Sequence, residues 1–568
     1  MKNVTFAIDR LRSSLATVSS RKLFAVLTLA SALLYFAGLN ARYLMDSDEP
    51  RVAGISTELM ISGNWLEPHL NGKSFLEKPP LYFWADAMCI KIADQLGLEG
   101  PMAAKLPSAV SAFLGVLLLF WLLRAMRYSP LTCMLGGFFL ATSAQYWRNG
   151  RKCIVDTFLC FFILVAMTAF YKIASTRKSS HRVCFFVMYA LGIGGAVMSK
   201  GLVGAAIPGI AICAFLAADD FLVEHKFTWK RWLLAVIGGG LGFLPMAIWL
   251  LMLYKESGYE AFRVAFWVNN IGRFTGGHAE HVEPFYYYLR KLPELFQPWM
   301  ALIPFALYWA WTQVKSSAKQ SRELLFMASW LLLPFLLLMV ASGKRGIYML
   351  PLFPAAALLA GVFAASLLEG KIKVPKFNID IILNGLLYIL PALPAVFGIV
   401  FGIINLVHGR TGLAVSMSFV TGIVFTFFAY YFMREGKFML RYAMCLIFSL
   451  VLVMLQVDTD IYAPKNAERS YRNYFTAVKK IIKSSDDNPV LLMCNPEERF
   501  RGASVYYLQR DDVPVISSLE QARQYKGRVL IMVAQERLPE GAMDPKKVEN
   551  LLTVEMRKDH YMVLTPKK

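Results

Sequence analysis

Several acidic and basic side chains stand directly beside long apolar stretches, where charged residues are costly and often functional. Among the acids, Asp48 and Glu49 follow the first apolar stretch, and Asp156 lies just inside a later one. Basic residues flank other apolar stretches, at Arg148, Arg151, Lys152, Lys200, Lys344 and Arg345. Converging cations of this kind would bind a phosphate and stabilise the charge that builds on it as it departs, while an acid orients or deprotonates an acceptor. This is the chemistry that sugar transfer from a lipid phosphate requires.

Each of these residues also has a purely structural explanation. Single Lys and Arg side chains can extend to lipid headgroups. Asp48 and Glu49 can cap a helix that has Pro50 in its first turn, and Asp156 can pair with Arg151 or Lys152 about one turn away. The recurrence of the cations at several helix ends on the same predicted side favours a shared anionic ligand.

The composition indicates that a membrane protein carries these residues. Of the 568 residues, 57% are hydrophobic and 17% are charged, with a net charge of +21, whereas soluble domains have about 25% charged residues. This balance excludes a soluble enzyme, and a nucleic-acid binder would have more total charge and less continuous apolar sequence. The 8 cysteines show no CxxC spacing, so neither a disulfide framework nor a zinc finger is indicated.

Hydropathy predicts about thirteen transmembrane helices. The predicted spans cover residues 23–44, 105–126, 130–146, 153–171, 183–198, 201–217, 232–253, 298–314, 324–341, 348–368, 381–407, 413–433 and 439–457. If successive spans cross the membrane in opposite directions, most Lys/Arg clusters fall on one side of it. The positive-inside rule assigns this side, which also holds the N-terminus, to the cytoplasm. The C-terminal tail then lies outside the cytoplasm.

The chain therefore divides into a membrane domain, residues 1–463, and a tail, residues 464–568. Two long outer loops, residues 45–104 and 254–297, are expected to contain interfacial helices, the first of them over residues 79–97. In the tail, periodicity predicts helices over residues 468–483, 497–508 and 519–525. It predicts strands over residues 490–494, 529–534, 551–556 and 561–564. The tail is thus a small α/β domain without a P-loop or a GxGxxG motif.

Specific motifs in the first outer loop carry a family resemblance. They are Asp48-Glu49-Pro50-Arg51 and the longer block Glu77-Lys78-Pro79-Pro80-Leu81-Tyr82-Phe83-Trp84, followed by Ser199-Lys200-Gly201, Arg273-Phe274 and Tyr348 in the same order. The sequence resembles the bacterial 4-amino-4-deoxy-L-arabinose lipid A transferases, within the protein O-mannosyltransferase-like superfamily of the GT-C fold. The matching motifs run through about the first two thirds of the chain.

The resemblance implies an inverting glycosyltransferase of the bacterial inner membrane whose active site and C-terminal domain face the periplasm. Its donor would be a sugar on polyprenyl (undecaprenyl) phosphate, and its acceptor would be lipid A or another envelope glycan or a protein. By position, Asp48 and Asp156 would be the catalytic acids, with Glu49 as a third candidate. The expected ligands of the donor phosphate or sugar are Lys78, Lys200, Arg273 and Tyr348, with Arg51, Lys344 and Arg345 as further cations.

The resemblance also raises the question of a divalent metal. Glu77 is a metal-ligand candidate, and the family's histidine before its Arg-Phe is replaced here by the segment at residues 267–272. His69 and His278 are possible substitutes, although surface histidines are common and the pattern indicates zinc only weakly. No other cofactor and no nucleic-acid partner are expected, and the protein is expected to act as a monomer among membrane lipids.

Two other functions fit parts of the pattern. A transporter or flippase of the same lipid would place ionisable residues near the bilayer midplane, often in repeated halves, whereas the charges here lie at helix ends and no repeat is visible. A membrane ligase that joins a preassembled polysaccharide to lipid would share the cationic outer cavity. The sequence does not identify the sugar or the acceptor.

Overall fold

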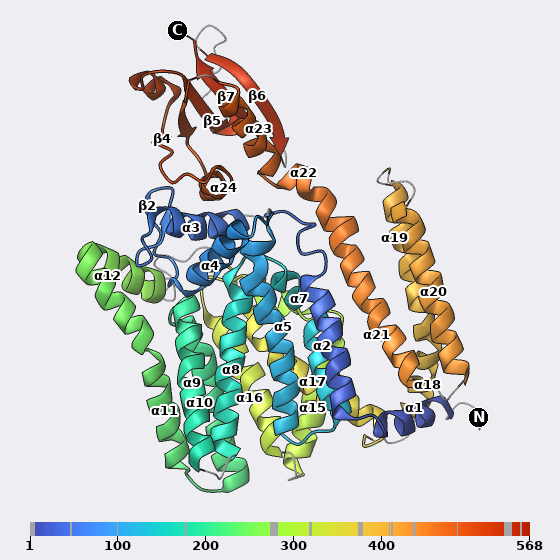
Figure 1. The fold of residues 1–568 in the computed structure, drawn as a ribbon. Coiled ribbons are helices and arrows are strands. Elements are labelled where there is room, and N and C mark those ends of the chain that lie inside the picture. Colours follow the sequence, from blue (N-terminus) through green and yellow to red (C-terminus); the bar gives the residue numbers. More distant parts are fainter. Residues whose placement is uncertain are drawn as a thin grey trace.

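The computed structural model describes residues 6–45, 48–98, 100–175, 179–272, 282–316, 321–372, 379–407, 409, 413–435, 439–485, 487–538, 548–556 and 559–567. It consists of a large helical block with a small α/β domain above one end (Figure 1). We call this end of the block the domain-facing end. The predicted polytopic helical fold with a C-terminal α/β domain is confirmed.

Within the described residues, 9 helical stretches are long and apolar enough to cross a bilayer. They contain α5 (Met102–Ala125), α8 (Val155–Ser175), α9 (Ser179–Lys200), α10 (Val203–Asp219) with η1 (Asp220–Glu224), α11 (Trp229–Gly242) with α12 (Leu244–Arg263), α16 (Ser321–Val340), η4 (Gly346–Leu352) with α17 (Phe353–Leu368), α18 (Ile379–Ile389) with α19 (Leu393–Val407), and α21 (Met439–Gln456). The remaining predicted spans correspond to α2 (Ser20–Phe36), α6 (Pro130–Thr142), α15 (Leu302–Lys315) and α20 (Leu413–Glu435). Each predicted span therefore contains helix, although the helix of the first span ends at Phe36, before the predicted end at residue 44.

Not every predicted span is a single helix. The stretch at residues 232–253 is divided between α11 and α12, which meet at Phe243 just before Pro245. Proline lacks the backbone N–H that would continue the helical hydrogen bonds, so α11 ends here and α12 begins (Figure 1). Gly258, at φ 82°, breaks α12 again, in a conformation that glycine adopts without steric cost.

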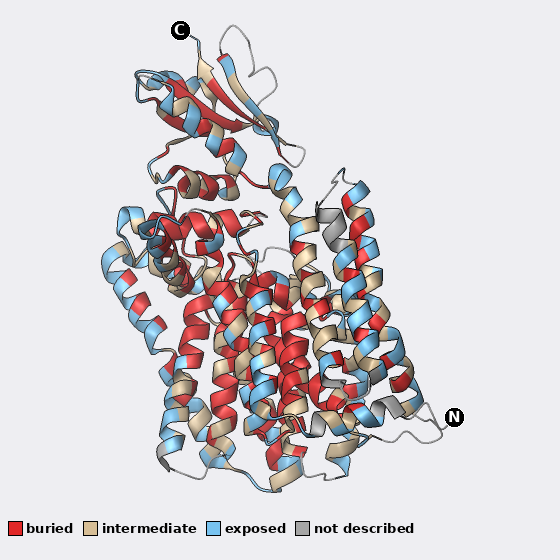
Figure 2. Cartoon of the chain, turned by 45° about the vertical axis from the view of Figure 1, so that its right-hand side comes forward, coloured by how far each residue is buried: buried red, intermediate tan, exposed pale blue. Residues whose placement is uncertain are grey.

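The main apolar core lies between the helices at the centre of the block (Figure 2). Helix α17 is almost entirely buried there. Its Gly361 contacts Gly136 of α6 so closely that a Cβ on Gly361 would lie 2.7 Å from the Gly136 Cα. Small residues thus let α6 and α17 pack backbone against backbone, as is common between membrane helices.

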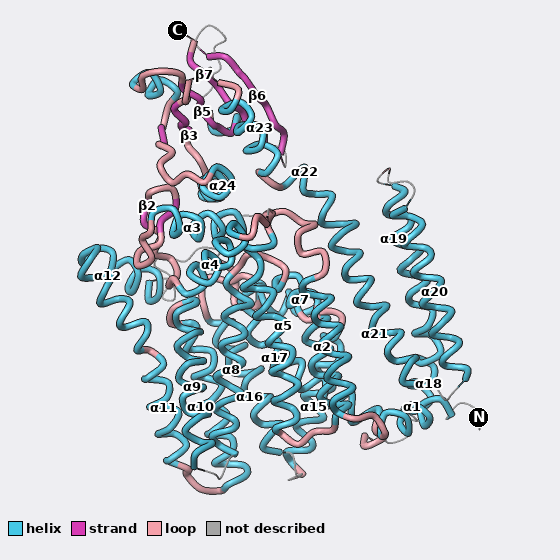
Figure 3. Tube along the Cα trace, in the orientation of Figure 1, coloured by secondary structure: helices cyan, strands magenta, loops and turns pink. Residues whose placement is uncertain are grey.

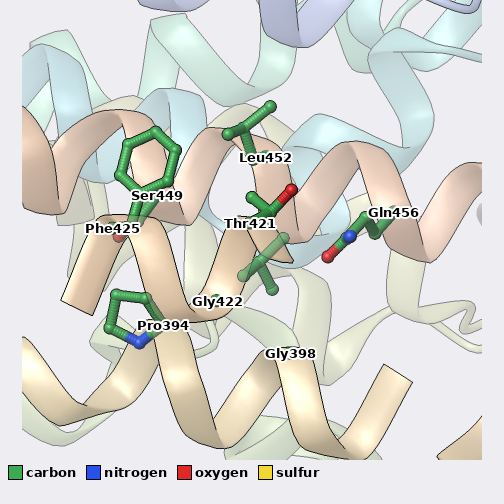
Figure 4. A pocket seen from close by; sticks show the side chains of 9 residues that line it. Pro394, Gly398, Thr421, Gly422, Phe425, Ser449, Leu452 and Gln456 are labelled. Atoms are coloured by element: carbon green, nitrogen blue, oxygen red, sulfur yellow. The ribbon is translucent and has the colours of Figure 1, made fainter. Parts of the chain in front are cut away.

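Helices α18 to α21 form a separate group beside this core (Figure 1). Small residues allow close packing here as well, and Figure 4 shows Pro394 and Gly398 of α19 facing Thr421 and Gly422 of α20, with Ser449 of α21 nearby. The gap between the three helices is only about 10 Å³, room for about one water molecule. At the opposite end of the block from the α/β domain, α1 (Phe6–Ala16) packs against this group, with an Arg12–Asp380 ion pair of 2.7 Å.

The domain-facing end is covered by the two outer loops. The first contains α3 (Asp48–Ser62), a hairpin of β1 (His69–Leu70) and β2 (Lys73–Ser74), and α4 (Leu81–Gln95), which starts directly after Pro79-Pro80 as predicted. The second contains η2 (Val264–Gly272) and α14 (Tyr287–Leu295), and η3 (Trp299–Ala301) follows it. Irregular segments gather between the helical block and the α/β domain (Figure 3), so side chains from distant parts of the sequence meet there.

The α/β domain has a mixed five-stranded sheet in the order β4-β3-β5-β7-β6. Its strands are β3 (Val490–Cys494), β4 (Val515–Ile516), β5 (Val529–Ala534), β6 (Val548–Met556) and β7 (Asp559–Pro566). Helices α23 (Arg472–Lys483) and α24 (Glu498–Leu508) pack on one face, and the 3-10 helix η8 (Leu519–Gln524) packs on the other. The four predicted strands are present, and β4 is an addition, because two residues are too few to show a periodicity.

The boundary predicted at residue 464 falls inside a helical connection. Helix α21 continues through η6 (Val457–Tyr462), η7 (Ala463–Lys465) and α22 (Asn466–Arg469). The helix predicted over residues 468–483 is interrupted at Ser470, which has an extended backbone, and resumes as α23. Asn466 ties this connection to the first outer loop, since its side chain accepts a 2.8 Å hydrogen bond from Tyr43 N and donates one of 2.8 Å to Ala41 O.

The α/β domain rests on α3 through α24. A Cβ on Gly54 of α3 would lie 2.4 Å from the carbonyl oxygen of Gly502 in α24, so the two backbones are in direct contact. Beside this crossing, the Asn71 side chain donates a 2.9 Å hydrogen bond to Val513 O. The docking surface therefore depends on two glycines that face each other.

A buried ion pair joins the first and last parts of the membrane domain. Arg151, which follows α7 (Ala144–Gly150), lies 2.6 Å from the Asp458 carboxylate after α21, and both side chains are at most 7% exposed. Arg151 also donates a 2.7 Å hydrogen bond to Leu34 O. The pair fixes α21 against α2 and α7.

Replacing Gly54 with alanine is expected to loosen the docking of the α/β domain. The added methyl group meets backbone rather than a flexible side chain, so we expect a loss of about 1–3 kcal/mol in stability. Limited proteolysis should then release a fragment that starts near residue 470, and thermal unfolding in detergent should begin earlier. Gly209→Ala is the control, because a Cβ at that helical position meets nothing within 4 Å; equal protease resistance of both variants would contradict the prediction.

Replacing Asp458 with alanine should destabilise the membrane domain strongly. It leaves the buried Arg151 charge without its carboxylate, a change that costs about 3–5 kcal/mol in other buried pairs. The measurement is thermal unfolding of the purified protein, followed by tryptophan fluorescence. The control is Asp512→Ala, which removes the carboxylate from the exposed Arg510–Asp512 pair. This change should lower the free energy of unfolding by less than about 1 kcal/mol.

Candidate functional site

The first carboxylate of the candidate site is Asp48, in the first turn of α3. Its Oδ1 accepts a 2.7 Å hydrogen bond from Arg51 Nη2, and its Oδ2 accepts one of 2.9 Å from Arg345 Nη2. Loss of hydration raises the pKa of Asp48, but the charges of Lys78, Arg345 and Arg51 outweigh this effect and lower the pKa below its usual range. Asp48 is therefore ionised at neutral pH and is a weak proton acceptor.

The second carboxylate is Asp156, in the first turn of α8, a position where the helix dipole favours a negative charge. It forms an ion pair with Lys200, the last residue of α9. The Lys200 ammonium also lies 4.5 Å from the centroid of the Tyr348 ring, a cation–π contact. The pairing of Asp156 with Arg151 or Lys152, which the sequence left open, is replaced by a pairing with Lys200.

The position of Lys200 depends on the glycine that follows it. Gly201 has φ 67° and ends α9, which leaves the Lys200 side chain at the rim of the bundle. Asn270 of η2 closes over this turn and accepts a 2.8 Å hydrogen bond from Leu202 N. The Ser-Lys-Gly motif thus sets both the end of the helix and the depth of the lysine.

Lys78 lies between the two carboxylates. Loss of hydration and the nearby charges of Arg51 and Lys200 lower its pKa to about 8, against the opposing effects of Asp48 and Asp156. The side chain is half-buried, and it makes no hydrogen bond or ion pair with any residue in the described part of the chain. A cation held between other cations without a direct partner is suited to bind an anion from outside the protein.

A cavity of about 420 Å³ opens on the Arg345 side of Asp48. Its lining contains five basic side chains, Arg148, Lys152, Lys291, Lys344 and Arg345, and four acidic ones, Asp48, Glu49, Glu283 and Glu294. Asp48 therefore lies beside two regions: a compact group with Lys78, Asp156, Lys200 and Tyr348, and this larger cavity.

Two expected site residues have other bonding partners. Glu49 is fully buried and accepts hydrogen bonds of 2.7 and 2.6 Å from Arg42, besides bonds from Met45 N and Cys153 N. The structural explanation therefore fits Glu49, and both of its oxygens are already bonded. Lys344 is 4% exposed and donates to the backbone oxygens of Glu283 and Ala341, which ties the second outer loop to the end of α16.

The expected zinc ligands do not assemble in the part of the chain that is described. Glu77 lies close enough to raise the pKa of Arg51, and His69 Nε2 is 3.9 Å from Glu67 in the hairpin region. Within the described ranges, no three His, Cys, Asp or Glu side chains are grouped to hold a metal ion. Two expected site residues, Arg273 and His278, lie outside the described residues.

Sequence reasoning missed the partners that fix this site. Arg42 binds Glu49, Asp458 binds Arg151, and Lys105 donates to the backbone oxygens of Leu39 and Arg42. The available signal was the presence of charged residues within or directly beside apolar segments. Such residues were interpreted as ligand-binding groups. Several of them instead pair with charged residues that are distant in the sequence.

Comparisons with known proteins show what the chain is similar to in sequence and in fold. The family model of dolichyl-phosphate-mannose-protein mannosyltransferases matches residues 64–267. Two proteins named undecaprenyl phosphate-alpha-4-amino-4-deoxy-L-arabinose arabinosyl transferase are similar in sequence. The one from Edwardsiella ictaluri is 30% identical over 58% of this chain, and the one from Aeromonas salmonicida is 31% identical over 62% of it. The matched regions span 57% and 62% of these relatives' lengths.

The structural comparison extends over almost the entire chain. The crystal structure of ArnT from Cupriavidus metallidurans bound to undecaprenyl phosphate superposes with a TM-score of 0.70 and 18% sequence identity, and covers 95% of this chain and 97% of that chain. Its apo structure gives a TM-score of 0.69 at 19% identity. The resemblance stated from the sequence is thereby confirmed: the chain is similar in sequence to these arabinosyl transferases and shares the fold of the ArnT structure.

Proposed function

We propose that the chain is an inverting glycosyltransferase that takes a sugar, 4-amino-4-deoxy-L-arabinose, from undecaprenyl phosphate and transfers it to a lipid A phosphate. The observation that carries this proposal is the convergence of Asp48 and Asp156 with Lys78, Lys200 and Arg345 at the domain-facing ends of the helices. The names of the sequence relatives support the donor and the sugar. The reaction would take place at the periplasmic face of the inner membrane, the side to which the positive-inside rule assigns these helix ends.

In the proposed reaction, an acceptor oxygen attacks the anomeric carbon as the bond from that carbon to the donor phosphate oxygen breaks. The departing phosphate keeps the electron pair, so its negative charge increases. Lys78 would bind this phosphate, since its ammonium has no direct partner in the described part of the chain. Lys200, held against Asp156 and Tyr348, and Arg345 would add positive charge around it. Fixed cations aimed at a developing charge lower the barrier because they need no reorganisation during the reaction.

The electrostatics of Asp48 favour a phosphate acceptor. A hydroxyl acceptor needs a base that takes its proton, and the cations around Asp48 make it a weak base. An ionised phosphate oxygen has no proton to lose, and Arg148 and Arg345 in the lining of the cavity beside Asp48 would bind an anionic acceptor. We therefore assign Asp48 the role of fixing Arg51 and Arg345 against the reacting groups, and place the acceptor in the cavity.

The position of the charges argues against a transporter. A flippase of the same lipid would need ionisable groups along a path through the bilayer, whereas the site lies at the ends of α8 and α9 and in the outer loops. A ligase for preassembled polysaccharide is the other alternative. A ligase would use a donor that carries an oligosaccharide, whereas the proposed enzyme would use a donor that carries one sugar. A transfer assay with each donor therefore distinguishes the two.

Asp48→Asn should abolish most turnover while leaving the fold intact. The substitution retains the shape but removes the charge that holds Arg51 and Arg345, so we expect a loss of about 100-fold or more in kcat. Purified protein is incubated with undecaprenyl-phosphate aminoarabinose and lipid A, and the product is detected by mass spectrometry. The control is Asp94→Asn, an exposed carboxylate on α4. Full activity of Asp48→Asn would remove Asp48 from the site, and absence of transfer by the wild type would contradict the proposed function.

Donor-phosphate binding should weaken as pH rises through about 8. The pKa of Lys78 is lowered to about 8, so its ammonium is charged below that pH and loses its charge above it, where its attraction for phosphate is lost. In Lys78→Arg the charge persists throughout this range, and the affinity should then vary little between pH 7 and 9.5. Binding of undecaprenyl phosphate is measured by quenching of tryptophan fluorescence.

Lys73→Arg, at an exposed position in the hairpin, should retain the wild-type pH dependence. A wild-type affinity that stays constant between pH 7 and 9.5 would show that Lys78 does not contact the phosphate.

A further inference from the structure

Helix α24 of the α/β domain packs directly on the turn of α3 that carries Arg51 (Figure 1). A Cβ added to Gly502 would lie 2.4 Å from the Pro50 oxygen and 2.6 Å from the Arg51 Cα. The contact is therefore made with the backbone of the residue that binds Asp48. A shift of α24 would move the first turn of α3, and with it the candidate site.

The domain also contributes a side chain to this region. Glu498, the first residue of α24, accepts a 2.7 Å hydrogen bond from Arg51 Nη1. The other terminal nitrogen of Arg51, Nη2, donates the 2.7 Å bond to Asp48 Oδ1. One guanidinium thus bridges a carboxylate of the candidate site and a carboxylate of the C-terminal domain.

The surroundings leave the Arg51 guanidinium little freedom. Its side chain is 15% exposed, and its Cζ lies 5.5 Å from the centroid of the Phe75 ring. Glu498 is 53% exposed, and exposed ion pairs contribute little to stability. The contribution of Glu498 is therefore one of orientation more than of folding energy.

The orientation matters because a guanidinium prefers to bind one carboxylate through two parallel hydrogen bonds. With Glu498 on Nη1, Arg51 bonds only Oδ1 of Asp48, and Oδ2 remains available to Arg345. Without Glu498, Nη1 is released and Arg51 can take both oxygens of Asp48. Arg345 would then lose its fixed partner at the edge of the cavity.

We infer that Glu498 is a positioning residue and that the C-terminal domain, through Glu498 and Arg51, sets the orientation of the Asp48 carboxylate. This inference rests on the proposed function for its effect on turnover. It gives the domain a part in the reaction although none of its residues contacts the reacting atoms. Because Lys78 and Lys200 do not depend on Glu498, donor binding should be preserved when Glu498 is changed.

The test compares Glu498→Ala with Glu520→Ala, an exposed residue of the same domain on η8. We expect Glu498→Ala to lower kcat about tenfold, since small displacements of positioned groups have large effects on rate. The donor KM should stay within about twofold of wild type. In an Arg51→Ala background, Glu498→Ala should cause no further loss, because its effect passes through Arg51.

Several results would overturn the inference. They are an unchanged kcat in Glu498→Ala, an equal loss in Glu520→Ala, or the same loss with and without Arg51. Limited proteolysis checks that the domain stays docked. If alanine releases it, Glu498→Leu takes its place in every comparison, since it retains most of the size but has no acceptor oxygen for Arg51 Nη1.

A second measurement does not depend on activity. Amide hydrogen exchange of residues 49–55 should be faster in Glu498→Ala than in wild type and unchanged in Glu520→Ala, because the first turn of α3 loses a restraint. If the wild-type protein transfers no sugar, the proposed function is contradicted. The comparison of exchange rates then still tests whether Glu498 restrains the first turn of α3. Equal exchange in all three proteins would overturn the positioning role.

Discussion

The arrangement of the domain-facing end depends on one electrostatic constraint: three cations, Arg51, Lys78 and Arg345, surround the carboxylate of Asp48. Arg51 and Arg345 bond its two oxygens, and Lys78 is held nearby without a direct partner among the described residues. Repulsion among these cations is unfavourable in the free protein and is relieved when an anion enters. The same excess charge that weakens Asp48 as a base makes the site attractive to phosphate.

The surrounding structure supports this constraint with ion pairs of a different kind. Arg42 with Glu49 and Arg151 with Asp458 are buried pairs whose charges are satisfied within the protein. They lock the helix ends and the first outer loop, and they contain no unpaired charge that could bind a ligand. The structure thus separates cations that hold the fold from cations that are available for binding, although both kinds occur side by side in the sequence.

Much of the fold follows from the sequence because the dominant forces are local. Continuous apolar runs predicted the helices of the block and the two buried strands at residues 490–494 and 529–534, and the structure has them at those positions. The break before Pro245 had a visible signal in the proline itself. The charge partners could not be predicted in the same way. Arg151 pairs with Asp458 rather than with Asp156 because the packing of α21 against α2 brings them together, and no local pattern encodes that contact.

The Arg151–Asp458 pair also has a consequence for how the protein is made. Its two residues are separated by 307 positions, so Arg151 is synthesised and inserted long before its counter-ion leaves the ribosome. Domains generally fold as units during synthesis, from the N-terminus onward. Here the Arg151 side chain cannot form its ion pair until the residues that follow the last membrane helix arrive. Biogenesis of the membrane domain therefore ends with a closing step, and a chain truncated before α21 would leave an unneutralised arginine for quality-control proteases to recognise.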